Sequence, residues 1–319
     1  MQFAVRLQHF STPFATALFL LWMVCTPSLS LAGGIAVLTR DDIVPYNIFS
    51  KAFVGSVTRS DAVTSDVRIF LVHGLSDLEQ QKIITDIAEF GPSLLLAIGS
   101  GAFSFVRTHF STIPCVCAMV VNPVLLHSAV GTKTACLRME VTPQAKLTQL
   151  RQIMPGVRHV GAVYDPQQCA DQVRLLQEAA ARLGITVEAW PVSSTKMAMQ
   201  SFEKIMPRID ALFMFYDKTV LAPQSLQHMF TLSFRYKIPV VGISEKYVRL
   251  GALFSLDVDI KDLGRRAWKW SRGCMHNNKP CTGVHYLDAR WDLYLNATVA
   301  PKMNIAIPPD VLQKAVLIE

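Results

Sequence analysis

From residue 34 onward the chain alternates short apolar runs with longer segments in which apolar residues recur every three or four positions. Short apolar runs predict buried strands, and the longer periodic segments predict helices. A first series of strands is expected at residues 34–39, 67–72, 94–99, 115–120 and 135–139. A second series is expected at residues 159–165, 186–192, 211–217, 238–243 and 252–257. This alternation predicts an α/β fold of two doubly wound parallel-sheet lobes of similar build.

Helix signals occur between these strands. Residues 76–90 form an amphipathic pattern whose apolar face carries Leu78, Ile83, Ile84, Ile87 and Phe90. Between the two series, Thr142 is placed to cap a helix, Pro143 occupies its first position and Gly156 ends it. The chain is therefore expected to pass from one lobe to the other near residue 142.

The N-terminus has the composition of an export signal. Residues 14–25 are an uninterrupted apolar run, preceded by Arg6 and followed by small, turn-prone residues. The run is shorter than the roughly 20 residues that span a bilayer. We therefore expect residues 1–32 to be a signal peptide cleaved after Ala32, with a retained membrane anchor as the alternative, and the remaining chain to be periplasmic.

The chain has a formal net charge of +7, which is a mild excess for 319 residues. Its densest basic segment, residues 264–273, also contains Trp268 and Trp270, a mixture found in nucleic-acid-binding proteins. The basic residues have helical spacing, and export removes most nucleic-acid partners. We therefore expect an amphipathic helix with a solvated face and no nucleic-acid partner.

Six of the seven cysteines follow residue 32, and an oxidising compartment permits them to pair. Cys274 and Cys281 bracket a short polar loop and are the expected disulfide. Cys115 and Cys117 alternate along one apolar run as core residues, and one of them is within reach of Cys136 if their strands are neighbours. A lone C-x-C lacks the second ligand pair of a zinc site, so no metal is expected.

The sequence Gly99-Ser100-Gly101 joins an apolar strand to the start of a helical pattern. The free N–H groups at a helix start attract a carboxylate, and the Ser100 hydroxyl adds a donor. The alternative is a tight turn that merely needs small residues. A lone G-x-G after the third strand is not a dinucleotide fingerprint, so no cofactor is expected.

Known catalytic motifs are absent from the sequence, which contains no G-x-S-x-G, H-E-x-x-H or Walker loop. The eight histidines are dispersed and form no local pair at metal spacing. We therefore expect a protein that is not an enzyme, with a catalytic site assembled only in three dimensions as the alternative.

Four stretches of the chain resemble the exported substrate-binding proteins of ABC transporters, a bacterial family that includes tryptophan-binding members. They are "LLLAIGSGAF" with "STIPCVCAMVVNP" after it, "KLTQLRQIMPGVRHVGAVYDP", "IPVVGISEKYVRLGALFSLDVDIKDLG" and "MNIAIPPDVLQKAVLIE". The resemblance implies a type I periplasmic binding protein whose two lobes, joined by three crossovers, close on a small ligand. The first lobe would comprise residues 33–141 with about 257–290, and the second residues 142–256 with about 291–319.

The resemblance also implies a set of ligand contacts at the strand ends, namely Asp42, Tyr46, Ser100, Gly101, Asn122, Asp217, Ser244 and Glu245. Ser100 and the neighbouring N–H groups would hold a carboxylate, and Asp217 or Glu245 would face an ammonium group. Tyr46 and Tyr164 would cover an apolar or aromatic side chain. The alternatives are that the aspartate caps a helix and that the tyrosines pack locally.

An amino-acid-like ligand follows from these roles, although Asn122 stands where many relatives carry Asp, so the ligand's identity is not carried over. The expected function is a monomeric solute receptor that delivers its ligand to an ABC permease. Two alternatives remain: a periplasmic sensor module that signals to a membrane partner, and an exported enzyme.

Overall fold

The computed structural model describes residues 33–59, 66–120, 125, 133–275, 281–287 and 289–319. The predicted signal peptide and the predicted ligand contact Asn122 lie outside these residues. Within the described part, no helix has both the length and the apolar character needed to cross a membrane.

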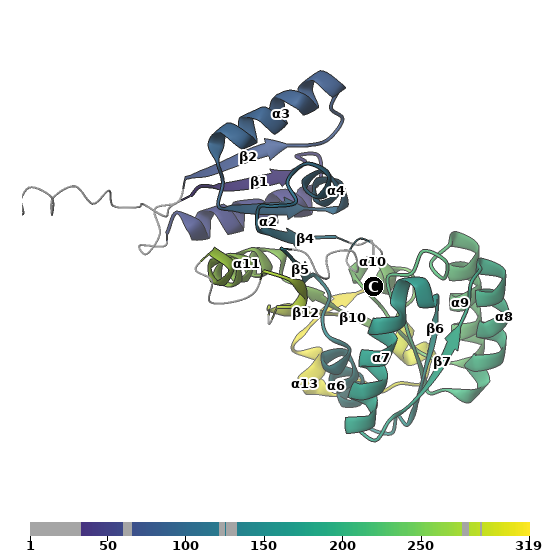
Figure 1. The fold of residues 1–319 in the computed structure, drawn as a ribbon. Coiled ribbons are helices and arrows are strands. Elements are labelled where there is room, and N and C mark those ends of the chain that lie inside the picture. Colours follow the sequence, from purple (N-terminus) through teal and green to yellow (C-terminus); the bar gives the residue numbers. More distant parts are fainter. Residues whose placement is uncertain (1–32, 60–65, 121–124, 126–132, 276–280, 288) are drawn as a thin grey trace, which may run out of the picture. The chain divides into compact units, whose positions relative to one another are not determined.

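The first lobe is built on a six-stranded sheet in the order β11-β5-β4-β3-β1-β2, with all neighbours parallel (Figure 1). Its strands are β1 (Ile35–Thr39), β2 (Val67–Leu71), β3 (Leu94–Ile98), β4 (Cys115–Ala118), β5 (Thr134–Arg138) and β11 (Gly283–Tyr286). Every residue of β1, β3 and β4 is buried. Strands covered on both faces have continuous apolar sequences, which explains why these runs were readable from the sequence.

Helices cover both faces of this sheet. They are α2 (Val44–Val57), α3 (Asp77–Phe90), α4 (Ser100–His109) and α11 (Ile260–Met275). α2 and α11 supply side chains to the core on one face, and α3 and α4 to the core on the other. α3 begins as the sequence predicts, because Ser76 and Glu79 form a reciprocal capping box, and Gly91 ends it in the left-handed conformation.

The basic segment at residues 264–273 lies in α11, which packs closely against α2. A side-chain carbon at Gly264 would lie 2.6 Å from the Phe49 carbonyl oxygen, so the absence of a side chain permits the close approach. Trp268 on the same buried face meets Phe53 edge-on, with ring centroids 5.8 Å apart. The sequence prediction of an amphipathic helix is therefore confirmed.

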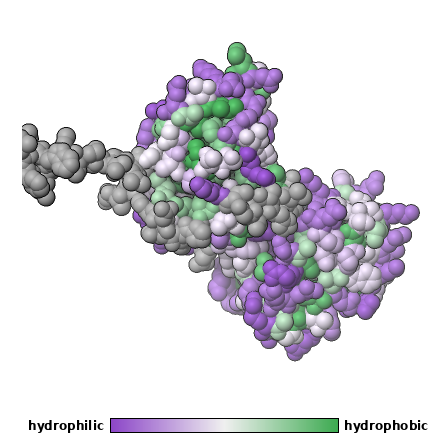
Figure 2. Space-filling model, viewed as in Figure 1, coloured by the Kyte–Doolittle hydropathy of each residue, from purple (hydrophilic) through white to green (hydrophobic). Residues whose placement is uncertain are grey.

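Hydrophobic residues reach the surface at the open edge of the first sheet. β2 is its outermost strand, and Ile69 and Leu71 are 53% and 44% exposed. Figure 2 shows hydrophobic residues on the visible face of this lobe. Arg68 directly precedes Ile69 and packs over the Phe90 ring, and a charged residue on an edge strand opposes pairing with another sheet.

The second lobe has a seven-stranded sheet in the order β13-β12-β10-β9-β8-β6-β7. Its strands are β6 (His159–Tyr164), β7 (Thr186–Pro191), β8 (Ala211–Phe213), β9 (Val240–Val241), β10 (Phe254–Val258), β12 (Trp291–Asn296) and β13 (Ala315–Ile318). β10 and β12 are antiparallel, and the other neighbours are parallel. The sequence analysis did not predict β11, β12 or β13. Polar residues interrupt the apolar pattern of β11 and β12, whereas β13 is a run of only four apolar residues at the end of the chain.

The helical elements of the second lobe are α6 (Pro143–Ile153), α7 (Pro166–Arg182), α8 (Thr195–Ile205), η1 (Met206–Arg208), α9 (Pro223–Tyr236), α10 (Glu245–Arg249), α12 (Val299–Lys302) and α13 (Pro309–Leu312). α6 and α7 contribute to the core on one face of the sheet, and α8 and α9 to the core on the other. Thr142 caps α6 and Pro143 is its first residue, as the sequence predicts.

The chain passes between the two sheets three times, at residues 139–142, at Asp259 and between β11 and β12. The second and third crossovers are joined by hydrogen bonds. The Asp259 N–H donates to the Arg290 carbonyl at 2.8 Å, and the Arg290 N–H donates to the Asp262 carboxylate at 2.9 Å. These bonds join the two segments side by side.

Asp262 is the centre of this connection, with only 7% of its side chain exposed. Arg265 and Arg266 donate to its carboxylate at 3.1 and 2.6 Å. Although burial opposes ionisation, the Arg290 N–H and the two guanidinium groups lower the pKa of Asp262 to about 2. The carboxylate is therefore ionised at every pH at which the protein is expected to work.

We predict that Asp262→Asn destabilises the protein at pH 7 by about 2 kcal/mol, because an amide loses the charge-assisted bonds to both arginines. Since the folded-state pKa lies below the usual 3.8, this stability is present above about pH 4 and is lost as the pH falls towards 2. Urea unfolding at pH 7 and pH 2.5 measures both effects. Asp86→Asn, at an exposed position of α3, is the control, and an equal loss in the two variants would contradict the prediction.

The cysteine prediction requires a correction. The structure contains a disulfide between Cys117 and Cys136, which lie opposite each other on β4 and β5 with Cα atoms 4.5 Å apart. The predicted Cys274–Cys281 disulfide is not formed. Those two side chains are hydrogen-bonded thiols, and Cys281 also donates to the Cys115 carbonyl at an Sγ–O distance of 3.4 Å. The register of β4 and β5 places Cys117 opposite Cys136, a pairing that the sequence analysis gave only as an option.

We predict that Cys117 and Cys136 are recovered as one linked peptide when the protein is alkylated before proteolysis. Replacing both by alanine should lower the free energy of unfolding by about 3 kcal/mol, the expected effect of opening a loop of this size. Denaturant unfolding of the variant and of the chemically reduced protein should agree. Recovery of both residues as alkylated thiols would contradict the assignment.

Candidate functional site

The first lobe has a pocket at the carboxyl ends of β1, β2 and β3. Its volume is about 150 Å³, and it is lined by Thr39, Arg40, Tyr46, Val72, His73, Ile98, Ser100, Gly101 and Ala102. Parallel strands direct their carboxyl ends to one edge of the sheet, where ligands bind in open α/β folds. The pocket brings together three residues predicted from the sequence, Tyr46, Ser100 and Gly101.

Backbone geometry at Gly99 shapes this pocket. Gly99 has φ 88°, in the region that favours glycine, and its N–H donates to the Ala118 carbonyl at 2.8 Å. A side-chain carbon on Gly99 would lie 2.4 Å from the Tyr46 ring. The Tyr46 ring therefore lies directly against the turn, in space that a side chain at position 99 would fill.

The first turn of α4 presents donors to the same pocket. No side chain caps this helix, and the space beside the Gly101 Cα atom is open. The first N–H groups of a helix have no partner within the helix, and the helix dipole adds partial positive charge. This end of α4, with the Ser100 hydroxyl, can hold a carboxylate.

Asp42, which the sequence analysis predicted as a ligand contact, is paired with Arg40 in the structure. Its carboxylate accepts two hydrogen bonds from the Arg40 guanidinium, and this contact lowers the pKa of Asp42. Arg40 lines the pocket. The arrangement indicates that Asp42 orients Arg40, which in turn adds positive charge near the start of α4.

Asp217 in the second lobe is almost fully enclosed, with 1% of the residue exposed. Its carboxylate accepts the N–H groups of Asp165 at 2.6 Å, Thr219 at 2.9 Å and Val220 at 3.1 Å. Burial raises the pKa of Asp217 despite these bonds. The contacts fix the turn after β8 and favour the structural role that sequence analysis kept as the alternative.

The other residues predicted in the second lobe, Ser244, Glu245 and Tyr164, do not share one location. Ser244 lines a pocket of about 180 Å³ together with Tyr216 and Asp257 at the ends of β9 and β10. Glu245 follows directly, with its N–H bonded to Asp257 at 2.8 Å and its carboxylate paired with Arg249. Tyr164 is half-buried against the core beneath α6 and α7. Ser244 and Glu245 are therefore adjacent to a pocket, whereas Tyr164 packs locally.

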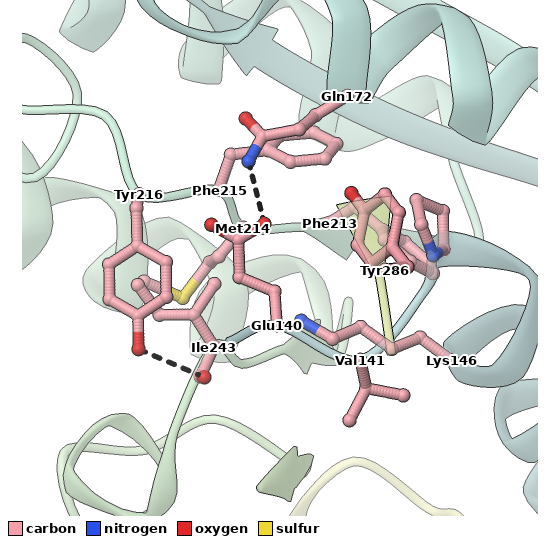
Figure 3. A pocket seen from close by; sticks show the side chains of 11 residues that line it. Glu140, Val141, Lys146, Gln172, Phe213, Met214, Phe215, Tyr216, Ile243 and Tyr286 are labelled. Carbon is pink, nitrogen blue, oxygen red and sulfur yellow. Dashed lines mark hydrogen bonds between the residues drawn. The ribbon is translucent and has the colours of Figure 1, made fainter. Parts of the chain in front are cut away.

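A second group of polar side chains lies beside the first crossover (Figure 3). The Glu140 carboxylate pairs with Arg138 at 3.2 Å and accepts the Gln172 amide N–H at 3.0 Å. Lys146 and Tyr286 line the same cavity. Sequence analysis missed all of them, because each lies in an ordinary helix, crossover or short strand with no motif around it.

Burial controls the ionisation of these groups. It lowers the pKa of Lys146 and raises the pKa of Asp257, and it raises the pKa of Tyr286 to about 12. Each shift disfavours the charged form of the group. Because these groups are shielded from water, a charged group of a ligand placed beside them would interact with them strongly. Among the described residues, no cluster of three or more histidine, cysteine or acidic side chains is arranged to hold a metal ion.

These features define a protein of two parallel-sheet lobes whose polar pockets lie at the carboxyl ends of the strands. Residues 67–318 match the family described as ABC transporter substrate binding protein, and the chain belongs to that family. A search of curated proteins finds no match.

Solved structures of the same fold cover nearly the whole chain. A ligand-free, open substrate-binding protein from Clostridium difficile, CD0873, is 18% identical with a TM-score of 0.66, covering 90% of this chain and 99% of that one. An ABC domain in complex with L-Trp from Streptococcus pneumonia is 19% identical with a TM-score of 0.57, covering 90% and 99%. A conserved domain protein from Vibrio cholerae is 20% identical with a TM-score of 0.56, covering 90% and 100%. These likenesses establish the type I periplasmic binding-protein fold.

Membership of this family gives the chain a solute-binding role with a small-molecule ligand and an ABC transporter as partner. Proteins of this family are typically exported and are generally not enzymes. The family therefore fixes the general activity, and the geometry of the pockets is what bears on the ligand.

We predict that Gly99→Ala destabilises the protein by about 2 kcal/mol or more, because it strains a left-handed backbone position and places a methyl group against Tyr46. A Gly99→Ala/Tyr46→Ala double variant should recover part of the loss, and a double-mutant cycle measures that part. The control is Gly101→Ala, where the space is open and the loss should be absent. Equal losses at Gly99 and Gly101 would contradict this account of the turn.

Proposed function

We propose that the protein is an exported receptor that binds an amino-acid-like solute at the carboxyl ends of its strands and delivers it to an ABC permease. The observation that supports this most directly is the first-lobe pocket, where the uncapped start of α4, the Ser100 hydroxyl and the Tyr46 ring meet. The expected ligand has a carboxylate on the α4 side and an apolar stem against Tyr46.

The carboxylate would accept hydrogen bonds from the first N–H groups of α4 and from Ser100. Backbone and hydroxyl donors that bind an anion form charge-assisted bonds, which are about twice as strong as neutral ones. Arg40 adds positive charge at the rim, where Asp42 holds it. The Tyr46 phenol is half-buried, and burial raises its pKa, so it meets the ligand as a neutral group.

The second lobe would supply the partner for an ammonium group. Glu245 begins α10 beside the pocket lined by Ser244, Tyr216 and Asp257, and it is partly exposed. Asp217, which sequence analysis also proposed, would act through the turn that it holds, since its oxygens already accept backbone N–H groups. Asn122 remains a proposed contact on the first lobe.

The three crossovers fit a hinge about which the two lobes close on the ligand. Hinge closure concentrates change in a few connecting residues and leaves the sheets rigid. We propose that residues 1–32 direct export, that the receptor is monomeric and that the closed form docks on a membrane permease. The L-Trp bound to the Streptococcus structure supports a ligand of amino-acid type.

A thermal-shift screen of the exported chain against amino acids, keto acids, purines and pyrimidines tests the proposal. A ligand that binds only the folded state at 100 times its Kd adds about 2.7 kcal/mol of stability. The proposal predicts that an amino acid raises the Tm. A shift with purines or pyrimidines alone would contradict it.

We predict that Ser100→Ala weakens binding of that amino acid about tenfold, the effect of losing one hydrogen bond to a charged group. The unliganded Tm should be unchanged, since Ser100 provides no capping bond to α4. Ser104→Ala, at an exposed position of the same helix, is the control and should bind normally. Equal affinities in the two variants would place the carboxylate elsewhere.

A further inference from the structure

A small cavity beside the first crossover contains a buried cation that the proposed function does not use. The cavity has a volume of about 20 Å³ and is lined by residues of α6, α7, the end of β8 and Tyr286 (Figure 3). This space exceeds the 10–15 Å³ that one water needs. It can admit one small polar end of a molecule, and it is too small for a ring.

The cation is Lys146, in the first turn of α6, and the residue is only 8% exposed. Across the described residues, its Nζ atom has no carboxylate within 4.0 Å and no hydrogen bond, while the side chain lines the cavity. An ammonium group removed from water without a partner costs free energy. A ligand oxygen with negative charge that entered the cavity would provide the missing partner.

The charged groups that face Lys146 are Glu140 and Asp257, and each is already engaged. Glu140 is neutralised by Arg138 at 3.2 Å and bound by Gln172 at 3.0 Å. Asp257 accepts the Ser255 hydroxyl at 2.6 Å and the Glu245 N–H at 2.8 Å. Burial lowers the pKa of Lys146, both carboxylates act in the opposite direction, and neither makes a direct ion pair with it.

The cavity adjoins the proposed ligand site. Glu140, Tyr216 and Ile243 line it and also line the pocket that contains Ser244. Phe213 and Tyr286 supply further apolar wall. A ligand in the Ser244 pocket could therefore extend one polar end towards Lys146, with its stem against aromatic and aliphatic side chains.

We infer that Lys146 determines specificity by binding a terminal carboxylate of the ligand, at the buried end of the site beside the first crossover. This inference rests on the proposed function and names its substrate class: an amino acid whose side chain ends in a carboxylate. The carboxylate at α4 lies in the first lobe and the one at Lys146 in the second. One ligand with two carboxylates would thus connect the two lobes and favour closure.

Isothermal titration of the exported chain with L-glutamate, L-glutamine, L-aspartate, L-asparagine and L-tryptophan tests the inference. Each acid differs from its amide by the charge of one terminal group. The wild-type protein should prefer one of the acids over its amide at least tenfold. Lys146→Met, which keeps the length of the side chain without its charge, should abolish the preference by weakening the acid. Lys196→Met, at an exposed position of α8, should leave it unchanged.

The unliganded Tm of Lys146→Met separates a recognition role from a structural one. Removing an unpaired buried ammonium group should leave the Tm unchanged or raise it. A large fall in Tm with an unchanged acid preference would mean that the cavity holds a structural water only, and would overturn the inference. Binding of L-tryptophan with no preference for either acid would also overturn it while leaving the proposed function intact. Failure of every probe to bind the wild-type protein would count against the proposed function itself.

Discussion

A parallel strand that is covered by helices on both faces is built mostly from apolar side chains. In this protein β1, β3 and β4 are buried at every residue, and small and aliphatic side chains make up most of their sequences. Polar groups gather where a strand ends and the backbone turns towards a helix. The pocket at Ser100 and the turn held by Asp217 both lie at such ends, one in each lobe. The burial of the strands thus concentrates polar side chains at the strand ends, where the pockets lie.

The strand ends use the same polar groups in two ways. The Asp217 carboxylate accepts hydrogen bonds from three backbone N–H groups and so stabilises a turn. At α4 the first backbone N–H groups have no side-chain cap, and the Tyr46 ring lies against Gly99. The carboxylate of Asp217 is satisfied within the protein, whereas the N–H groups at the start of α4 are open to water or to another acceptor.

Sequence analysis recovered the features that depend on local pattern. It predicted the ten strands of β1 to β10, the capped start of α6 and the amphipathic α11, because burial and capping leave periodic signals. It missed β11, β12 and β13, which are partly exposed and which join their sheets far along the chain from most of the strands beside them. The Cys117–Cys136 pair required strand register, which spacing along the sequence does not contain. The family resemblance pointed to Tyr46, Ser100 and Gly101 as contacts. Glu140 and Lys146 have no motif around them and were not predicted.

The two kinds of polar cluster at the crossovers differ in their ionic balance. Around Asp262 one carboxylate faces several cationic and N–H donors, and its pKa falls to about 2, so the charge is fully compensated. Around Lys146 the balance is incomplete, because the neighbouring carboxylates are bound to other donors and burial lowers the pKa of the ammonium group. A compensated cluster stiffens the connection between β10, α11 and the third crossover. A buried ammonium group without an ionic partner is relieved either by losing its proton or by meeting an anionic group. The two crossover regions therefore differ in kind: the charge at Asp262 is satisfied within the protein, whereas Lys146 has no ion pair among the described residues.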